Sequence, residues 1–190
     1  DGLGAHSGDA SVDLAAGLRK IRLEYFNGYK EPLLSVVWSG PGFEERSLTL
    51  TKSEGAIIVG DSRKTPQRWS YTSKKPADSW ARPGFKAKGW KKGPGGFGTH
   101  GTPGAVVKTE WKTRDIWLRK DFSLDRVPGT LFLDIYHDED AEVYLNGALV
   151  KKLSGHRGNY ISFSLPQTAV QALGAGLNTI AVHCRQTGGG

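Results

Sequence analysis

The chain has 190 residues, of which 37% are hydrophobic and 24% charged, with a net charge of +7, one Cys and no Met. This length suits one domain, or one domain and part of another. A single cysteine excludes a disulfide framework and a zinc site built on several thiolates, no apolar run is long enough to span a membrane, and the composition is not that of a disordered chain. Because Asp and not Met stands at position 1, we expect a mature or excised piece of a longer protein.

The first fifty residues predict about three strands. Residues 21–26 alternate between two faces with the period of a strand, and the turn-rich Ser-Gly-Pro-Gly run at 39–42 ends this piece. A connector over 51–66 follows, which begins with the polar residues 51–55. Fifty residues cannot readily bury a core of their own, so residues 1–50 either pair with the rest or are the end of a larger domain.

Most of the positive charge lies in residues 63–92. This segment has ten basic side chains and one acidic one, a net charge of +9, which leaves −2 for the remainder. Aromatic residues are interleaved with the basic ones, and such a combination can bind a polyanion, either nucleic acid or an acidic polysaccharide. The alternative is a solvated lysine-rich loop whose tryptophans point inward.

The glycines at 93–98 have the G-x-G-x-x-G spacing of a dinucleotide-binding fingerprint. No apolar strand precedes them and no helix follows, so the amide cluster that would bind a pyrophosphate is missing. We predict a packed glycine turn.

The remainder of the chain predicts short antiparallel strands. Alternating apolar residues recur around 116–122, 131–135, 143–145, 161–165 and 180–184, separated by turn residues. Asn146-Gly147 is the strongest hairpin signal, since both positions of its turn need positive φ. Only residues 167–173, closed by Gly174, predict a helical turn. The predicted fold class is therefore all-β, an antiparallel β-sandwich.

The acidic run at 137–140 follows a predicted strand. Asp138 and Asp140 are weak candidate ligands for calcium, the one cofactor that we consider, or they could form an acid/base pair; adjacent acids at strand ends also bind the amides of their own turn. Cys184 is in phase with Ile180 and Val182, which predicts a core thiol and not a nucleophile. His183 lies on the opposite face, at a site or at a solvated edge.

Six tryptophans are many for a chain of this length, and flat rings stack on sugar rings. Trp38, Trp69 and Trp117 fall in strand patterns and predict core positions. The candidate carbohydrate-binding residues are instead loop aromatics and nearby polar side chains: Trp80, Trp90, Trp111, Lys86, Lys88, Lys91, His156 and Arg157.

Two stretches resemble known families. The runs at 11–17, 21–28 and 34–42 resemble the closing strands of the protective-antigen-type β-sandwich domain of secreted bacterial glycosidases and adhesins. The match covers about the last third of that domain. The family's calcium loop lies earlier and cannot be carried over.

From Trp69 onward the chain resembles the galactose-binding-like jelly rolls of glycoside hydrolase family two and β-galactosidase-like enzymes. The residues that carry this resemblance are Trp80, the glycine turn at 93–98, the runs 113–119 and 138–147, and the run 176–182. The resemblance implies a jelly roll over 67–190 and places catalysis in a separate domain of the parent protein. Residues 85–89 read Phe-Lys-Ala-Lys-Gly where relatives usually have acidic residues, which puts an inherited ligand specificity in doubt.

These observations favour a non-catalytic carbohydrate-binding module of a secreted bacterial protein, extracellular or periplasmic. Its expected partners are an oligosaccharide or polysaccharide, which could be acidic, and a catalytic domain of the parent protein. The alternatives are a structural spacer that packs against a glycoside hydrolase domain, hydrolysis by Asp138 and Asp140, and nucleic-acid binding. We expect no membrane partner.

Overall fold

The computed structural model describes residues 10–13, 36–47, 57–64 and 66–188. The chain forms two compact units, residues 1–49 and 50–190. Within the described ranges, no helix is long and apolar enough to cross a membrane.

The first unit contains a β-hairpin. Strand β1 (Val37–Gly40) pairs antiparallel with β2 (Phe43–Ser47), and Gly40 faces Phe43 across the turn. Pro41 and Gly42 form this turn, and Gly42 has a φ of 87°, as the third residue of a type II turn requires. The sequence predicted that the front piece ends at this turn, and β2 was missed because a Pro-Gly pair also joins strands. The predicted strand at 21–26 and the side chain of Trp38 lie outside the described residues.

The second unit is built of antiparallel strands, with one parallel pair and little helix. Its strands are β3 (Arg68–Thr72), β4 (Lys91–Pro94), β5 (Phe97–Gly98), β6 (Thr109–Glu110), β7 (Asp115–Leu124), β8 (Phe132–Ile135), β9 (Asp140–Leu145), β10 (Ala148–Leu153), β11 (Ile161–Ser164) and β12 (Gly176–Arg185). Its helices are the 3₁₀ turn η2 (Asp78–Ala81) and the short α1 (Gln167–Gln171). The all-β prediction is confirmed, as is the helical turn expected after residue 166.

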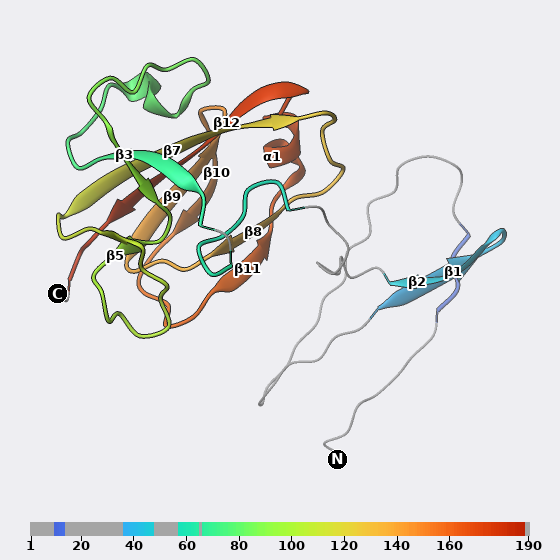
Figure 1. Cartoon of the computed structure of the whole chain (residues 1–190). Coiled ribbons are helices and arrows are strands. Elements are labelled where there is room, and N and C mark those ends of the chain that lie inside the picture. Colours follow the sequence, from blue (N-terminus) through green and yellow to red (C-terminus); the bar gives the residue numbers. More distant parts are fainter. Residues whose placement is uncertain (1–9, 14–35, 48–56, 65, 189–190) are drawn as a thin grey trace, which may run out of the picture. The chain divides into compact units, whose positions relative to one another are not determined.

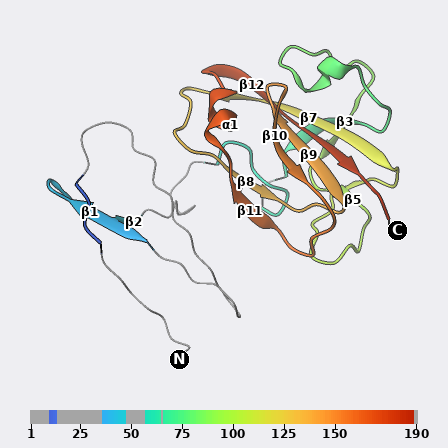
Figure 2. The same cartoon turned by 180° about the vertical axis from the view of Figure 1, so that it is seen from behind.

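Six strands form the main sheet, in the order β10-β9-β12-β7-β3-β4. Neighbouring strands in it are antiparallel, and β12 at its centre pairs with β7 along ten residues. Strands β8 and β11 form a separate antiparallel pair. Figures 1 and 2 show this pair at one side of the main sheet and the loop with η2 over β3 and β7.

The main sheet is packed on both of its faces. On the inner face, Ile116, Leu118, Val143 and Val182 form a cluster against which β8 side chains pack. On the outer face, residues 73–90, which we call the η2 loop, contribute Trp80 and Ala81 to a cluster with Trp117 and Ala181. For this reason residues 116–119 of β7 are buried in succession, and not at every second position.

Two asparagines, Asn146 and Asn178, anchor the β9–β10 hairpin by hydrogen bonds. Asn146 and Gly147 have φ values of 50° and 88°, as predicted for the β9–β10 turn. The Asn146 amide bonds to the Thr179 N–H, the Ala172 carbonyl and the Asn178 side chain, each at 2.8 Å. Asn178 is fully buried and also bonds to the backbone of Gly174 and Gly176. These amides tie the hairpin, the end of α1 and the start of β12 together.

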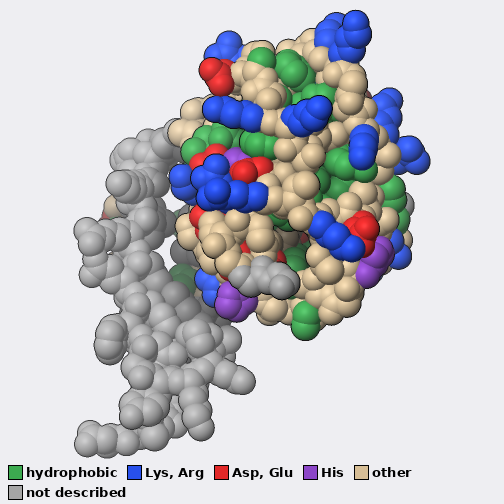
Figure 3. Space-filling model, turned by 90° about the vertical axis from the view of Figure 1, so that its left-hand side faces the viewer, with side chains coloured by type: hydrophobic (Ala, Val, Ile, Leu, Met, Phe, Trp, Pro, Cys, Tyr) green, Lys and Arg blue, Asp and Glu red, His purple; other side chains and the backbone are tan. Residues whose placement is uncertain are grey.

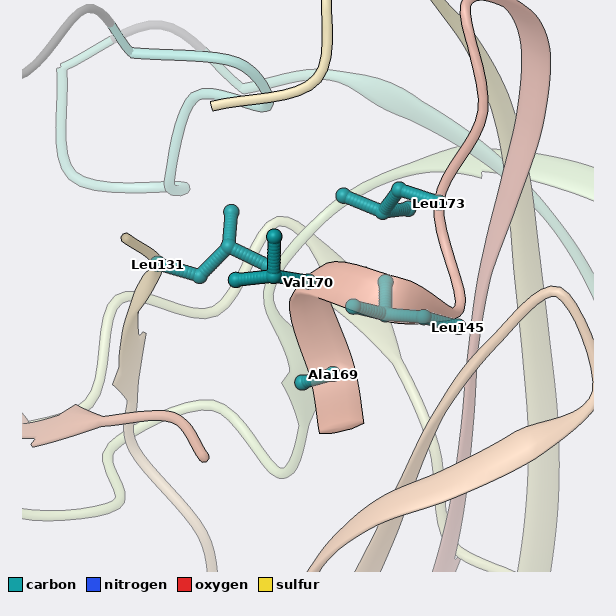
Figure 4. Packing of buried hydrophobic residues seen from close by; sticks show 5 residues of the cluster. All are labelled: Leu131, Leu145, Ala169, Val170 and Leu173. Atoms are coloured by element: carbon teal, nitrogen blue, oxygen red, sulfur yellow. The ribbon is translucent and has the colours of Figure 1, made fainter. Parts of the chain in front are cut away.

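Helix α1 closes one end of the sandwich. Ala169, Val170 and Leu173 pack against Leu131 and Leu145, as Figure 4 shows. Burial of this apolar face, and not helix propensity, holds a helix of five residues.

The glycine run at 93–98 is a packed turn, as predicted. A Cβ at Gly96 would lie 2.0 Å from the Val106 carbonyl, and one at Gly93 would lie 2.6 Å from the Thr109 hydroxyl. These positions therefore serve the close approach of β4 and β5 to residues 106–109.

Candidate functional site

Trp80 does not present an open ring. Its side chain is 8% exposed, and its ring is stacked on Trp90 at 6.5 Å and meets Tyr144 edge-on at 5.5 Å. The Trp80 ring therefore has no free face on which a sugar could stack, which argues against its predicted role as a sugar platform. The backbone of η2 turns the side chain onto the sheet, so a loop tryptophan becomes core.

The other two loop tryptophans are half-buried and lie in different clusters. Trp90 packs edge-on against Phe85 at 5.9 Å in the outer cluster. Trp111 packs against the inner cluster, and its indole N–H donates to the Thr113 hydroxyl at 2.9 Å. The two rings therefore form no shared platform, and sugar contact by either stays a prediction. The candidate lysines, which are Lys86, Lys88 and Lys91, are exposed beside Trp90 in the sequence.

A cluster of two tyrosines and an arginine lies where β8 and β11 meet their loops. The rings of Tyr136 and Tyr160 are 5.6 Å apart, and the Arg63 guanidinium lies 4.3 Å from the centre of the Tyr160 ring. Arg63 donates to the Asp61 carboxylate at 2.5 and 2.9 Å and lies 3.6 Å from Asp134. We call Arg63, Tyr136 and Tyr160 the tyrosine cluster.

Polar bonds fix the geometry of the tyrosine cluster. The Tyr136 hydroxyl donates to the Pro103 carbonyl at 3.0 Å, and the Tyr160 hydroxyl lies 3.4 Å from that of Ser62. The hydrogen bond from Arg63 lowers the pKa of Asp61, while burial, with help from Asp138, raises the pKa of Tyr136. At neutral pH the cluster thus presents one ordered ion pair, and the Tyr136 hydroxyl is protonated.

The loop at 154–160 brings two predicted residues to this place. His156 and Arg157 are exposed in the loop that ends at Tyr160, and the Arg157 N–H bonds to the His137 carbonyl at 3.0 Å. A Cβ at Gly104 would lie 2.1 Å from the Gly158 carbonyl, so this loop approaches the one around residue 104 closely.

The acidic run at 137–140 is engaged with its own surroundings. Asp140 accepts from the Gly155 N–H at 3.0 Å, Glu139 accepts from the Thr187 N–H at 2.9 Å, and the buried His137 ring bonds to the Glu139 carbonyl. Among the described residues, no group of three His, Cys, Asp or Glu side chains could hold a metal ion. Asp140 and Glu139 thus bind amides of two other segments and not those of their own turn, and calcium binding or acid/base chemistry by this run stays a prediction.

A polar row crosses the outer face of the main sheet. His183 lies between Asp115, at 2.8 Å, and Glu142, at 3.8 Å, and its ring stacks on Trp117 at 4.6 Å. Burial favours a raised pKa for Asp115, but hydrogen bonds from His183 and Arg185 outweigh it and the pKa is lowered. The pKa of Glu142 is lowered too, first by the hydrogen bond from Tyr144. His183 is thus part of an ordered network, and Cys184 beside it is a buried thiol whose pKa burial raises to about 12.

A hollow of about 220 Å³ opens at the junction of β3, β4 and β7. We call it the basic hollow, and its lining consists of Arg68, Trp69, Ser70, Lys92, Arg119, Lys120 and Asp121. Arg119 is 3% exposed and bonds to Asp121 at 2.9 Å and to the Trp80 carbonyl of the η2 loop at 2.9 Å. Figure 3 shows how widely Lys and Arg side chains are distributed over one face of the molecule.

Sequence reasoning missed the tyrosine cluster and half of the basic hollow. Tyr136 and Tyr160 sit at strand ends, where an aromatic residue also fits a core position, and only the pairing of β8 with β11 brings them together. In the hollow, Arg68 and Lys92 come from the predicted basic segment, whereas Lys120 and Asp121 come from β7. A charged pair in the middle of a long strand was the one signal available.

No family model and no curated protein matches the sequence. Solved structures similar to this chain include a β-glucuronidase from glycoside hydrolase family 2, with 18% identity, a TM-score of 0.49 and coverage of 70% of this chain and 15% of that one. A family 2 member from Bacteroides cellulosilyticus has 14% identity, a TM-score of 0.46 and coverage of 65% and 17%. The Bifidobacterium dentium β-glucuronidase complexed with coumarin-3-O-glucuronide has 17% identity, a TM-score of 0.46 and coverage of 63% and 19%. The chain thus spans less than a fifth of the length of these structures.

Proposed function

We propose that residues 50–190 form a non-catalytic glycan-binding module that serves a larger carbohydrate-active protein outside the cytoplasm. The observation that carries this proposal is the tyrosine cluster, with exposed His156 and Arg157 in the same loop. The sequence resemblance to galactose-binding-like jelly rolls supports it, because the runs that carry the resemblance form β7, β9 and β12 of an antiparallel sandwich.

The chemistry of the tyrosine cluster suits a sugar. Tyrosine rings offer apolar area to the C–H face of a pyranose, while their hydroxyls, an arginine and a carboxylate can bond to ring hydroxyls. Arg63 is held by Asp61 and by the Tyr160 ring, so little conformational entropy is lost when it binds. A preformed set of this kind fits weak, selective recognition.

Two observations support a non-catalytic role. The carboxylates at 139 and 140 accept hydrogen bonds from backbone N–H groups, which compete with a role in proton transfer. The thiol of Cys184 has a pKa of about 12 and is protonated at neutral pH. Catalysis would therefore belong to another part of the parent protein.

A glycan array followed by titration calorimetry tests the proposal. Replacing Tyr160 by Ala should weaken the binding of the best neutral glycan by roughly 1–3 kcal/mol, the range for loss of one stacking ring. Arg157→Ala should weaken it less, and Arg126→Ala, an exposed arginine between β7 and β8, serves as the matched control and should leave it unchanged. Circular dichroism confirms that each variant folds.

Two results would contradict the proposal. Binding that survives Tyr160→Ala but is lost in Trp90→Ala or Trp111→Ala would move the site to the predicted tryptophans. If no glycan binds the intact chain at millimolar concentration, the spacer alternative replaces the binding module.

A further inference from the structure

We propose that the basic hollow is an anion subsite, which binds the carboxylate or sulfate group of an acidic sugar. This inference rests on the proposed function and adds the class of glycan. It assigns a binding role to Arg68, Lys92 and Lys120, which belong to three adjacent strands of the main sheet.

The charges in the hollow are unequal. Its lining has four cations and one carboxylate, Asp121. Burial favours a raised pKa for Asp121, but hydrogen bonds from Thr179 and Arg119 outweigh it, so the pKa is lowered and the group is ionised at neutral pH. Asp121 forms a salt bridge with Arg119, and these two charges compensate each other.

Among the residues that the structure describes, the other three cations of the hollow have no such partner. No salt bridge with a carboxylate of the described residues holds Arg68, Lys92 or Lys120. Lys120 is turned toward the Arg68 carbonyl, at 3.4 Å from its oxygen. An anion in the hollow would supply the missing negative charge, and charge-assisted hydrogen bonds to an oxyanion are about twice as strong as neutral ones.

Arg119 gives the hollow a rigid wall. Its guanidinium bonds to Asp121, to the Thr179 hydroxyl and to carbonyls of the η2 loop. A side chain held in this way does not rearrange when a ligand enters, so the hollow is preformed.

The size of the hollow favours a sugar substituent over nucleic acid. About 220 Å³ is below the ~300–1,000 Å³ of pockets for drug-sized ligands, so it fits a single charged ring and not a chain. Nucleic acid needs cations along its backbone to release counterions. The same outer face instead continues, beyond Trp117, into the carboxylates of Asp115 and Glu142, which would repel a phosphate chain.

The experiment measures binding of the full chain to four probes: oligogalacturonate, dextran sulfate, unmodified dextran and single-stranded DNA. The test variant is Arg68→Gln with Lys92→Gln. The matched control is Lys74→Gln with Lys75→Gln, which removes the same charge from exposed residues that do not line the hollow. The affinity for the acidic probes should be lower in the test variant than in the wild-type chain by about tenfold or more, because charge-assisted contacts are lost.

In the control the affinity should change by less than about twofold, because exposed charges outside the site act only through a screened field. An equal loss in both double variants would show a general charge effect and overturn the inference. The inference would also be overturned if single-stranded DNA bound as tightly as the acidic glycans and with the same dependence on Arg68 and Lys92. Acidic glycans bound equally by the wild type and the test variant would overturn the anion subsite and leave the proposed function intact, whereas absence of all glycan binding would overturn both.

Discussion

Single buried polar side chains hold the ends of the elements in this module. Asn178 is fully buried and makes four side-chain hydrogen bonds to the backbone and to Asn146. Each partner left unsatisfied by a smaller side chain would cost roughly 1–3 kcal/mol. The resemblance that the sequence showed at 138–147 and 176–182 thus marks residues that maintain the fold, which is why it predicts architecture better than it predicts a ligand.

The residue scale also gives a pH dependence. The pKa of Asp115 is lowered from 3.8 in the folded chain, because hydrogen bonds from His183 and Arg185 outweigh burial. A carboxyl with a lowered folded-state pKa stabilises the fold above its unfolded pKa, and this contribution is lost as the pH falls through the folded value. Asp115→Asn should therefore lower the free energy of unfolding at pH 7, and the difference from wild type should shrink below about pH 4.

Urea unfolding at a series of pH values measures this effect. Asp125→Asn, at an exposed aspartate after β7, is the control and should follow the wild-type curve. A destabilisation by Asp115→Asn that is the same at pH 3 and pH 7 would show that the loss comes from packing alone.

At the scale of elements, the sequence predicts where the strands lie, but it does not predict which sheet faces are covered by loops. Alternation located β7, β9 and β12, and the turn residues located the β9–β10 hairpin. Alternation cannot tell whether a loop covers the outer face of a sheet, since that depends on residues far away in the chain. The buried position of Trp80 on that face follows from the path of the η2 loop, which no local pattern encodes.

Arg119 is predicted to hold the η2 loop in place. Its guanidinium donates to the carbonyls of Trp80 and Arg82, at 2.9 and 3.3 Å. Lysine keeps the charge but lacks the planar set of donors, so Arg119→Lys should release the loop. Each lost hydrogen bond is worth about 1 kcal/mol, so trypsin should cut within residues 73–90 about tenfold faster or more.

Limited digestion with mass spectrometry identifies the cut sites. Tryptophan fluorescence should shift to longer wavelength, because Trp80 would leave its place beside Trp90 and Tyr144. Arg114→Lys, at an exposed position just before β7, should change neither readout. Unchanged cleavage in Arg119→Lys would mean that apolar packing of Trp80 alone keeps the loop closed.

At the scale of the whole molecule, the cores of the described residues belong to one unit. The three clusters of buried apolar residues found among the described residues draw their members from residues 69–184. Since burial of apolar area is the main favourable term in folding, the second unit should be stable without residues 1–56. A chain of residues 57–190 should melt cooperatively, with the midpoint of its thermal transition equal to that of the full chain.

The matched control is a deletion at the C-terminal end of the chain. Removing residues 176–190 takes away β12, which pairs with both β7 and β9 at the centre of the main sheet, and with it the buried Thr179, Ala181 and Val182. This variant should show no cooperative transition, because loss of a central strand exposes both faces of the sheet and leaves the edges of β7 and β9 unpaired. Calorimetry and far-ultraviolet circular dichroism measure both variants. If the 57–190 chain melts at a clearly lower temperature than the full chain, residues 1–56 contribute to the stability of the module, and the two units do not fold independently.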